Sequence, residues 1–168
     1  MRNRTKDLTG STSKKVVVRR FEREPVLGFV NPRTYLTPGG IEILTRTGSI
    51  ALVPYGEVKA VCFVRDFEGI EPGPAQQLFH TRPKTDGLWV RMRFRDGELM
   101  DGLLANNLLQ LEPSGFTVVP PNPFSNSQRL FVPRQALLEM QVLGVVGSPL
   151  RRRKKAPAAG QMEMFPKD

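Results

Sequence analysis

The sequence predicts an all-β protein that consists of two small five-stranded barrels in tandem. Three observations carry this prediction. The 168 residues include 15 glycines and 15 prolines, a composition that favours turns and short strands over long helices. Apolar and polar residues alternate over short stretches that end in turn sequences, which is typical of half-buried strands. One order of strands and turns also occurs twice along the chain.

The repeated pattern begins with a hairpin at residues 16–28 (VVVRRFEREPVLG) and again at residues 89–102 (WVRMRFRDGELMDG). Each stretch contains an alternating strand, a polar turn and a short apolar return to a glycine. The second turn contains Asp-Gly at 96–97, a strong hairpin signal because both central positions of such a turn require positive φ. The first hairpin uses Glu22-Arg23-Glu24-Pro25 as its turn, is one residue shorter and is expected to turn differently.

The repeat resumes where a proline ends the fourth strand of each unit. In both units the next apolar anchor stands at the same distance from the proline, at Val58 after Pro54 and at Leu137 after Pro133. This spacing predicts a single helical turn between the fourth and fifth strands. Third strands are expected at residues 41–45 and 115–119. A hairpin, two strands, a helical turn and a fifth strand are the order of small SH3-like and Sm-like barrels.

The expected organisation is a disordered basic arm at 1–14, a first barrel at 15–71, a linker at 72–85, a second barrel at 86–146 and a disordered basic tail at 147–168. The alternative is one larger β-sandwich without a true repeat. Of the net charge of +9, residues 1–15 carry +4 and residues 151–168 carry +4, which leaves +1 for the rest. Phosphate attraction from these ends is expected to be weak and salt-sensitive. In the tail, the cations that would supply this attraction are Arg151, Arg152, Arg153, Lys154 and Lys155.

The sequence offers few residues for catalysis or metal binding. It has a single histidine, His80, in the predicted linker, and a single cysteine, Cys62, in an apolar run that favours a buried packing role. One of each does not make a zinc site, and no glycine-rich phosphate loop or nucleophile motif is present. We expect no enzyme activity, no cofactor and no metal. One cysteine allows no internal disulfide and no apolar run is long enough to span a membrane, so a soluble cytoplasmic protein is predicted.

Three stretches of the chain resemble one uncharacterised bacterial domain family. They are VKAVCFVRDFEG at 58–69, FRDGE at 94–98 and GFTVVPPNPFSNSQRLFV at 115–132. The resemblance covers residues 15–146. Two positions depart from the family pattern, because Asn122 replaces an aspartate and Ser127 replaces an asparagine. The resemblance implies a domain that occurs alone or beside bacterial signalling modules such as PilZ domains, with no assigned activity.

A PilZ domain binds a cyclic dinucleotide through Arg-x-x-x-Arg and a later Asp/Asn-x-Ser-x-x-Gly. Arg19 and Arg23 have the first spacing, but Arg23 falls in the predicted turn and the second motif is absent from the sequence. A PilZ-like module that binds a cyclic dinucleotide is therefore kept only as a second alternative function.

Two groups of residues in the body are candidate site residues. The first group follows the last strand of the first barrel, and we expect it to tie this barrel to the linker through charged hydrogen bonds. This signature consists of Arg65, Asp66, Phe67, Glu68 and Gly69. The second group lies in the long loop of the second unit and offers contacts to a partner. It consists of Phe124, Asn126 and Arg129, of which Phe124 is the aromatic residue expected to be exposed.

The tail contains the apolar cluster Gln-Met-Glu-Met-Phe at residues 161–165. It resembles the short peptide by which many bacterial replication and repair proteins dock on the DNA sliding clamp. The resemblance implies that Gln161 hydrogen-bonds at the edge of the clamp pocket and that Met162 takes the second position. Met164 and Phe165 would fill the hydrophobic pocket. The alternative is a solvated tail with incidental apolar residues.

These observations predict a non-catalytic adaptor that binds a protein partner through peptides in its tails, with the DNA sliding clamp as the candidate. Nucleic-acid binding by Sm-like barrels and basic tails is the alternative function. The near-neutral body favours the adaptor, because nucleic-acid-binding domains usually carry their charge on a folded face.

Overall fold

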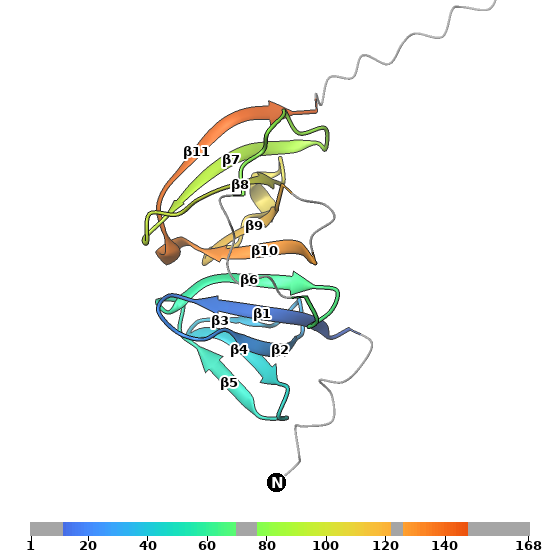
Figure 1. The fold of residues 1–168 in the computed structure, drawn as a ribbon, viewed down its shortest axis with the longest axis vertical. Coiled ribbons are helices and arrows are strands. Elements are labelled where there is room, and N and C mark those ends of the chain that lie inside the picture. Colours follow the sequence, from blue (N-terminus) through green and yellow to red (C-terminus); the bar gives the residue numbers. More distant parts are fainter. Residues whose placement is uncertain (1–11, 70–76, 122–125, 148–168) are drawn as a thin grey trace, which may run out of the picture.

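The computed structural model describes residues 12–69, 77–121 and 126–147, and these residues form an all-β fold, which confirms the predicted class (Figure 1). The first half contains β1 (Lys14–Arg20), β2 (Val26–Val30), β3 (Leu36–Thr37), β4 (Gly40–Thr45), β5 (Ile50–Val53) and β6 (Val58–Val64). The second half contains β7 (Gly87–Phe94), β8 (Leu99–Leu104), β9 (Gly115–Val119), β10 (Ser127–Pro133) and β11 (Leu137–Val146). Two single-turn 3-10 helices belong to the second half, η2 (Leu108–Gln110) and η3 (Arg134–Ala136). Within the described ranges, no helix has the length and apolar character needed to cross a membrane.

The eleven strands belong to one antiparallel sheet. Their order is β11-β7-β8-β9-β10-β6-β1-β2-β4-β3, and β5 pairs with β4. Within each half the last strand pairs with the first, as it does in a small barrel. The halves are joined in the middle of the molecule, where β10 pairs with β6 (Figure 1). The structure thus shows one open sheet with two similar halves, and the prediction of two tandem barrels is not confirmed.

The two halves match in the register of their strands. Val58 of β6 lies opposite the last residue of β1, and Leu137 of β11 lies opposite the last residue of β7. In both halves the next residue of the last strand has no partner in the first strand, so the register shifts by one residue at the same place. This extra residue is Lys59 in β6 and Leu138 in β11. A shared irregularity of this kind supports a true internal repeat, because β-bulges are specific features of a fold.

This match corrects the sequence alignment of the hairpins. Arg20, and not Phe21, takes in the first hairpin the place that Phe94 takes in the second. With this match the strand registers give both hairpins the same length, so the expected difference of one residue is wrong. The turns still differ in conformation, because positive φ is adopted by Glu22 (55°) in the first and by Gly97 (85°) in the second. Phe94 donates from its backbone N–H to the carbonyl of Glu98, which leaves a three-residue loop at 95–97. Asp96 does not adopt positive φ, so this loop requires a left-handed residue only at its glycine.

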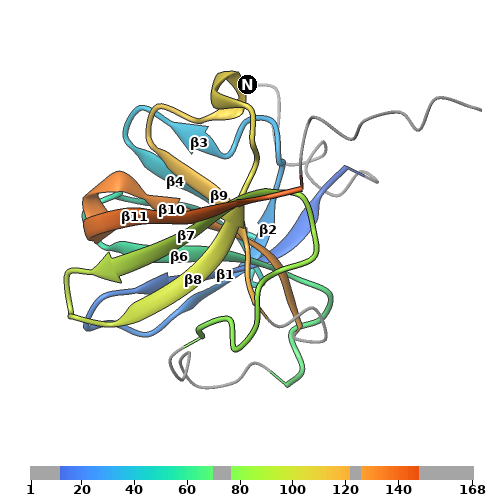
Figure 2. The same ribbon diagram turned by 90° about the horizontal axis from the view of Figure 1, so that it is seen from above.

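The two halves share their hydrophobic cores. Val17 of β1 and Ala60 and Cys62 of β6 are buried among residues of the second half. Conversely, Phe131 of β10 is fully buried in the core of the first half, where its ring packs edge to face on Tyr35. The halves are stacked along the long axis of the molecule, and the view down this axis shows β7 and β8 overlying β6 and β1 (Figures 1 and 2).

Strands β1, β6 and β10 lie between the two cores and are buried on both faces. Their sequences are therefore continuous apolar runs instead of alternating ones, at residues 16–18, 60–63 and 130–132. Neighbouring residues of one run face opposite cores, as successive side chains of a strand must. Because each of the three strands contributes side chains to both cores, the two halves are joined along these strands.

Candidate functional site

The signature residues 65–69 form a turn directly after β6, and Asn126 fastens this turn. The side-chain oxygen of Asn126 accepts hydrogen bonds from the backbone N–H groups of Arg65 and Asp66, both at 3.1 Å. Its Nδ2 donates to the carbonyl of Asp66 at 2.6 Å and to that of Glu68 at 3.4 Å. The structure therefore brings together the signature and the long loop, two groups that the sequence singled out. The amide of Asn126 is occupied by backbone groups of its own chain.

Asp66 connects the signature to β1. Its carboxylate accepts hydrogen bonds from Lys15 Nζ at 3.2 Å and from the backbone N–H of Phe67 at 2.9 Å. These two hydrogen bonds lower the pKa of Asp66. Among the described residues, the partners observed are β1 and residue 126. The expected tie to the linker stays a prediction, because part of the predicted linker lies outside the described residues.

Phe67 lies at the centre of a small basic and aromatic surface, the Phe67 patch, which consists of Phe67, Phe29, Lys15 and Arg46. The Phe67 ring packs edge to face on Phe29, with 5.6 Å between the ring centroids. Lys15 Nζ lies 5.7 Å from the centroid of the Phe67 ring, and the guanidinium carbon of Arg46 lies 5.4 Å from it. Phe67 is half-buried and Arg46 is exposed. Cations beside a partly exposed ring suit a ligand that offers both a phosphate and a flat base.

The other predicted contact residues are not part of this patch. Arg129 is exposed on β10, and its guanidinium lies over the ring of Phe63 at 5.1 Å from the centroid. Phe124, the five cations at 151–155 and the peptide at 161–165 lie outside the described residues.

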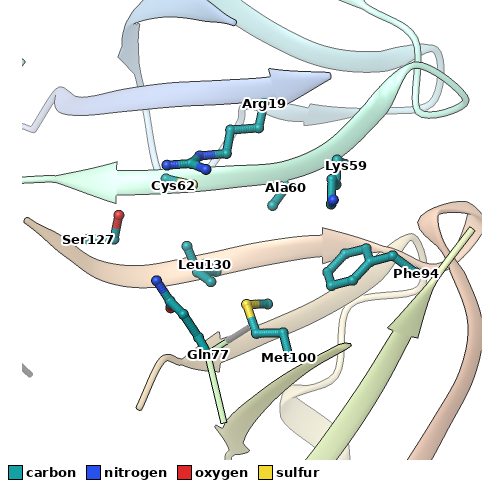
Figure 3. Close-up of a pocket in the computed structure, with 9 residues that line it drawn as sticks. All are labelled: Arg19, Lys59, Ala60, Cys62, Gln77, Phe94, Met100, Ser127 and Leu130. Carbon is teal, nitrogen blue, oxygen red and sulfur yellow. The ribbon is translucent and has the colours of Figure 1, made fainter. Parts of the chain in front are cut away.

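The two arginines with the spacing of a cyclic-dinucleotide motif are directed to different neighbours. Arg23 pairs with Glu57 at 3.2 Å, whereas Arg19 lines a cavity between the halves. Figure 3 shows the Arg19 side chain extending over Cys62 inside this cavity.

The cavity has a volume of about 40 Å³ and is lined by residues of β1, β6, β7, β8 and β10 and by Gln77 (Figure 3). This volume has room for a few water molecules. Burial raises the pKa of the Cys62 thiol, although hydrogen bonds from Arg19 and Ser127 oppose that rise. The thiol is therefore a protonated, buried packing group, as the sequence predicted. The lining consists of Arg19, Lys59, Ala60, Cys62, Gln77, Phe94, Met100, Ser127 and Leu130.

Lys59 joins the two halves through charge. Its ammonium group, on β6 of the first half, pairs with Asp96 and Glu98 in the hairpin between β7 and β8. Arg95 of the same hairpin donates to the carbonyl of Gly56 at 2.8 Å. Burial acts to raise the pKa of Asp96, but the hydrogen bonds from Lys59 and from a backbone N–H outweigh burial and lower it. The hairpin of the second half is thus fixed to the first half.

Asp101 of β8 is the charged residue that is completely buried within the described part of the chain. Its carboxylate accepts hydrogen bonds from Arg91 Nε at 2.7 Å and Arg91 Nη2 at 3.1 Å. It also accepts from Trp89 Nε1 at 3.2 Å and from the backbone N–H of Phe79 at 3.1 Å. The backbone N–H of Asp101 donates to the carbonyl of Gln77 at 2.8 Å. Asp101 therefore holds the chain before β7 against β7 and β8.

Residues 12–144, most of the chain, match a family of unknown function (DUF6982). The chain belongs to this family. None of the curated proteins and none of the solved structures matches the chain. The contacts of Asn126, Lys59 and Asp101 all lie within the residues that match DUF6982, so the family covers the joined body as a whole.

Proposed function

We propose that the chain is a non-catalytic adaptor, in which the joined sheet is a platform and the C-terminal peptide docks on the DNA sliding clamp. The use of polar residues in the body carries this proposal. Lys59 joins the halves, Asp101 holds the linker and Asn126 fastens the signature turn. Because each of these distinctive residues binds another segment of its own chain, the body is suited to a structural role, and recognition is left to its surface and its ends.

The strand order within each half supports its assignment to a small SH3-like or Sm-like barrel unit that opens where the halves join. In both halves the last strand returns to the first after a short turn. Small barrels of this kind commonly bind partners through strand edges and loops, and their fold alone does not select one partner. The proposed clamp partner is cytoplasmic in bacteria, which supports a cytoplasmic location.

The chemistry of the tail peptide suits an apolar pocket. Met164 and Phe165 offer a thioether and a ring, which adapt to irregular apolar surfaces, and Gln161 adds a hydrogen-bonding group. The chain between Val146 and Gln161 gives the peptide a reach of at most about 50 Å from the body. The five cations at 151–155 lie on this path, where DNA inside a clamp would attract them.

A synthetic peptide of residues 156–168 is expected to bind the bacterial sliding clamp with a dissociation constant of about 1 μM, or about −8 kcal/mol. Phe165→Ala in the peptide is expected to abolish binding, because buried aromatic anchors carry much of the energy of such contacts. Lys167→Ala is the matched control and should bind like the unaltered peptide. Fluorescence anisotropy of the labelled peptides measures binding of all three. No change in anisotropy at about 100 μM clamp would contradict clamp docking and leave the tail a solubilising role.

Nucleic-acid binding is the second candidate function, and the Phe67 patch favours it. Lys15 and Arg46 flank a half-buried ring, an arrangement that combines phosphate attraction with a surface for base stacking. Asp66 lies beside Lys15 and reduces the positive charge of the patch. Binding through this surface would therefore depend on added attraction from the basic tails and would weaken with salt.

In the full chain, Arg46→Ala is expected to weaken binding of a single-stranded oligonucleotide about three- to tenfold at low salt, because a cation next to the stacking ring is lost. Arg33→Ala removes another exposed arginine of the first half and should change the affinity less than about twofold. Anisotropy at two salt concentrations compares the variants. An equal loss of affinity in Arg46→Ala and Arg33→Ala would assign the binding to unspecific charge attraction and exclude the Phe67 patch as the binding site.

A further inference from the structure

The junction between the halves has a counterpart that the described residues leave open. Inside the chain, the fourth strand of the second half, β10, pairs with the outer edge of β6, the last strand of the first half. The strand of the first half that is equivalent to β10 is β5, which is the fourth strand when the short β3 is not counted. The strand of the second half that is equivalent to β6 is β11, the last one. Over the described residues, β5 pairs only with β4 and β11 only with β7. Within the part of the chain that the structure describes, two equivalent strand edges therefore remain unpaired at opposite ends of the sheet.

On the first of these edges, Leu52 is the counterpart of Phe131. Both β5 and β10 lead into Val-Pro, and the residue before that valine is Leu52 in one and Phe131 in the other. Phe131 is fully buried at the internal junction, whereas Leu52 is 55% exposed. Leu52 thus has the position of a junction residue without a strand beside it.

On the second edge, Val142 is the counterpart of Phe63. Phe63 lies opposite Val16 of β1, and Val142 lies opposite Val90 at the equivalent place in β7. Phe63 is buried, whereas Val142 is 58% exposed. The two edges carry most of the large apolar side chains that the described surface exposes. These are Ile50, Leu52, Leu138, Val142, Leu143 and Val145.

We propose that a second copy of the chain adds its β5 to the outer edge of β11, so that the internal junction is repeated between molecules. The register of the internal junction, transferred to these strands, places Leu52 of the second copy opposite Met140 and its Ile50 opposite Val142. Both pairs join apolar side chains, which stabilise antiparallel sheets across strands. The added strand also satisfies backbone groups of an open edge.

The lengths of the two strands agree with this register. β11 shifts its pairing with β7 between Leu137 and Glu139 and again between Val142 and Gly144. The regular segment between these shifts runs from 139 to 142, and β5 runs from Ile50 to Val53. The whole of β5 therefore fits the part of β11 that is regular.

The contact between copies is weaker than the internal junction. On the opposite face of β11, Glu139 and Gln141 occupy the positions that Ala60 and Cys62 occupy in β6. These polar side chains do not extend a second core, so only one face of the new contact is apolar. The association is therefore reversible and head-to-tail, since each molecule offers β5 at one end and β11 at the other.

Sedimentation velocity of the full chain over about 5 to 500 μM tests the association, and the average mass is expected to rise about twofold or more with concentration. Leu52→Glu and Val142→Glu each place a carboxylate against an apolar residue of the contact, so each variant alone should remain monomeric. Leu109→Glu is the matched control, at a leucine that is 95% exposed and on neither edge, and should associate like the unaltered chain.

A mixture of the two edge variants distinguishes a head-to-tail contact from a two-fold one. The Leu52→Glu chain keeps an intact β11 edge and the Val142→Glu chain keeps an intact β5, so their equimolar mixture is expected to form a dimer and nothing larger. Two β11 edges paired about a two-fold axis would instead leave Leu52→Glu dimeric by itself. That result, or a full chain that is monomeric at every concentration, would overturn the proposal. Ile50→Glu repeats the test of β5 if Leu52→Glu does not fold.

Discussion

Phe131→Ala is expected to lower the free energy of unfolding by about 3 to 5 kcal/mol. The residue belongs to β10 of the second half, yet its ring is fully buried in the core of the first, with 6.0 Å between its centroid and that of the Tyr35 ring. Its neighbours Leu130 and Val132 face the core of the second half. Because one strand serves both cores, the loss should reach both halves and leave a single unfolding transition at lower denaturant concentration.

The aromatic residues of the chain allow each half to be followed separately. The single tryptophan, Trp89, lies in the second half, and the two tyrosines, Tyr35 and Tyr55, lie in the first. Urea unfolding followed by tryptophan and by tyrosine emission should give coincident transitions for the unaltered chain and for Phe131→Ala. Two separated transitions would mean that the halves fold independently, as tandem barrels do. Leu109→Ala truncates an exposed leucine and should change the stability by less than about 0.5 kcal/mol.

Asp101→Asn is expected to destabilise the fold by about 2 to 4 kcal/mol. The buried carboxylate accepts four hydrogen bonds, whereas an amide has one acceptor oxygen and turns N–H groups toward the N–H groups of its partners. The side chain of Arg91 is 35% exposed and can turn to water, which relieves part of the cost. Chemical denaturation measures the change. Glu42→Gln, at an exposed carboxylate on β4, is the control and should be nearly neutral.

The pH dependence of stability gives Asp101→Asn a second readout. Burial alone would raise the pKa of Asp101, but the hydrogen bonds from Arg91, a backbone N–H and an indole outweigh burial and hold the pKa below its ordinary value of 3.8. The carboxylate therefore contributes stability that is fully present above the unfolded-state pKa and is lost as the pH falls through the lowered folded-state pKa. The variant should lose less stability in acid than the unaltered chain. Asp66 and Asp96, whose pKa values are also lowered, preserve the remaining acid dependence.

The strands could be predicted from the sequence because their signals are local. The third strands expected at 41–45 and 115–119 agree with β4 and β9 to within one residue. The joining of the halves was not predicted, because the pairing of β10 with β6 is a contact between distant segments and has no local signal. The non-alternating runs at residues 16–18 and 60–63 did carry the information, since a strand without polar alternation is buried on both faces.

The candidate site was predicted unevenly for the same reason. Asn126 was singled out as a contact residue, but its hydrogen bonds go to the backbone of the signature turn, a contact that no local pattern specifies. Asp101 was missed because it stands in an apolar strand and its partners come from two other segments. One signal was available: Asp101 lies directly opposite Arg91 across the hairpin, and oppositely charged cross-strand pairs are favourable.

The placement of β10 has a consequence for synthesis on the ribosome. About 70 residues separate the end of β6 from the end of β10, and their translation takes about 3 to 14 s at bacterial to eukaryotic elongation rates. During this interval the outer edge of β6 has no partner strand, and Val17, Ala60 and Cys62 have no second-half core to cover them. The nascent chain then exposes a strand edge beside apolar side chains, a surface that chaperones and other nascent chains recognise. Because the strand that covers this surface is among the last to be made, the surface stays open until translation is nearly complete.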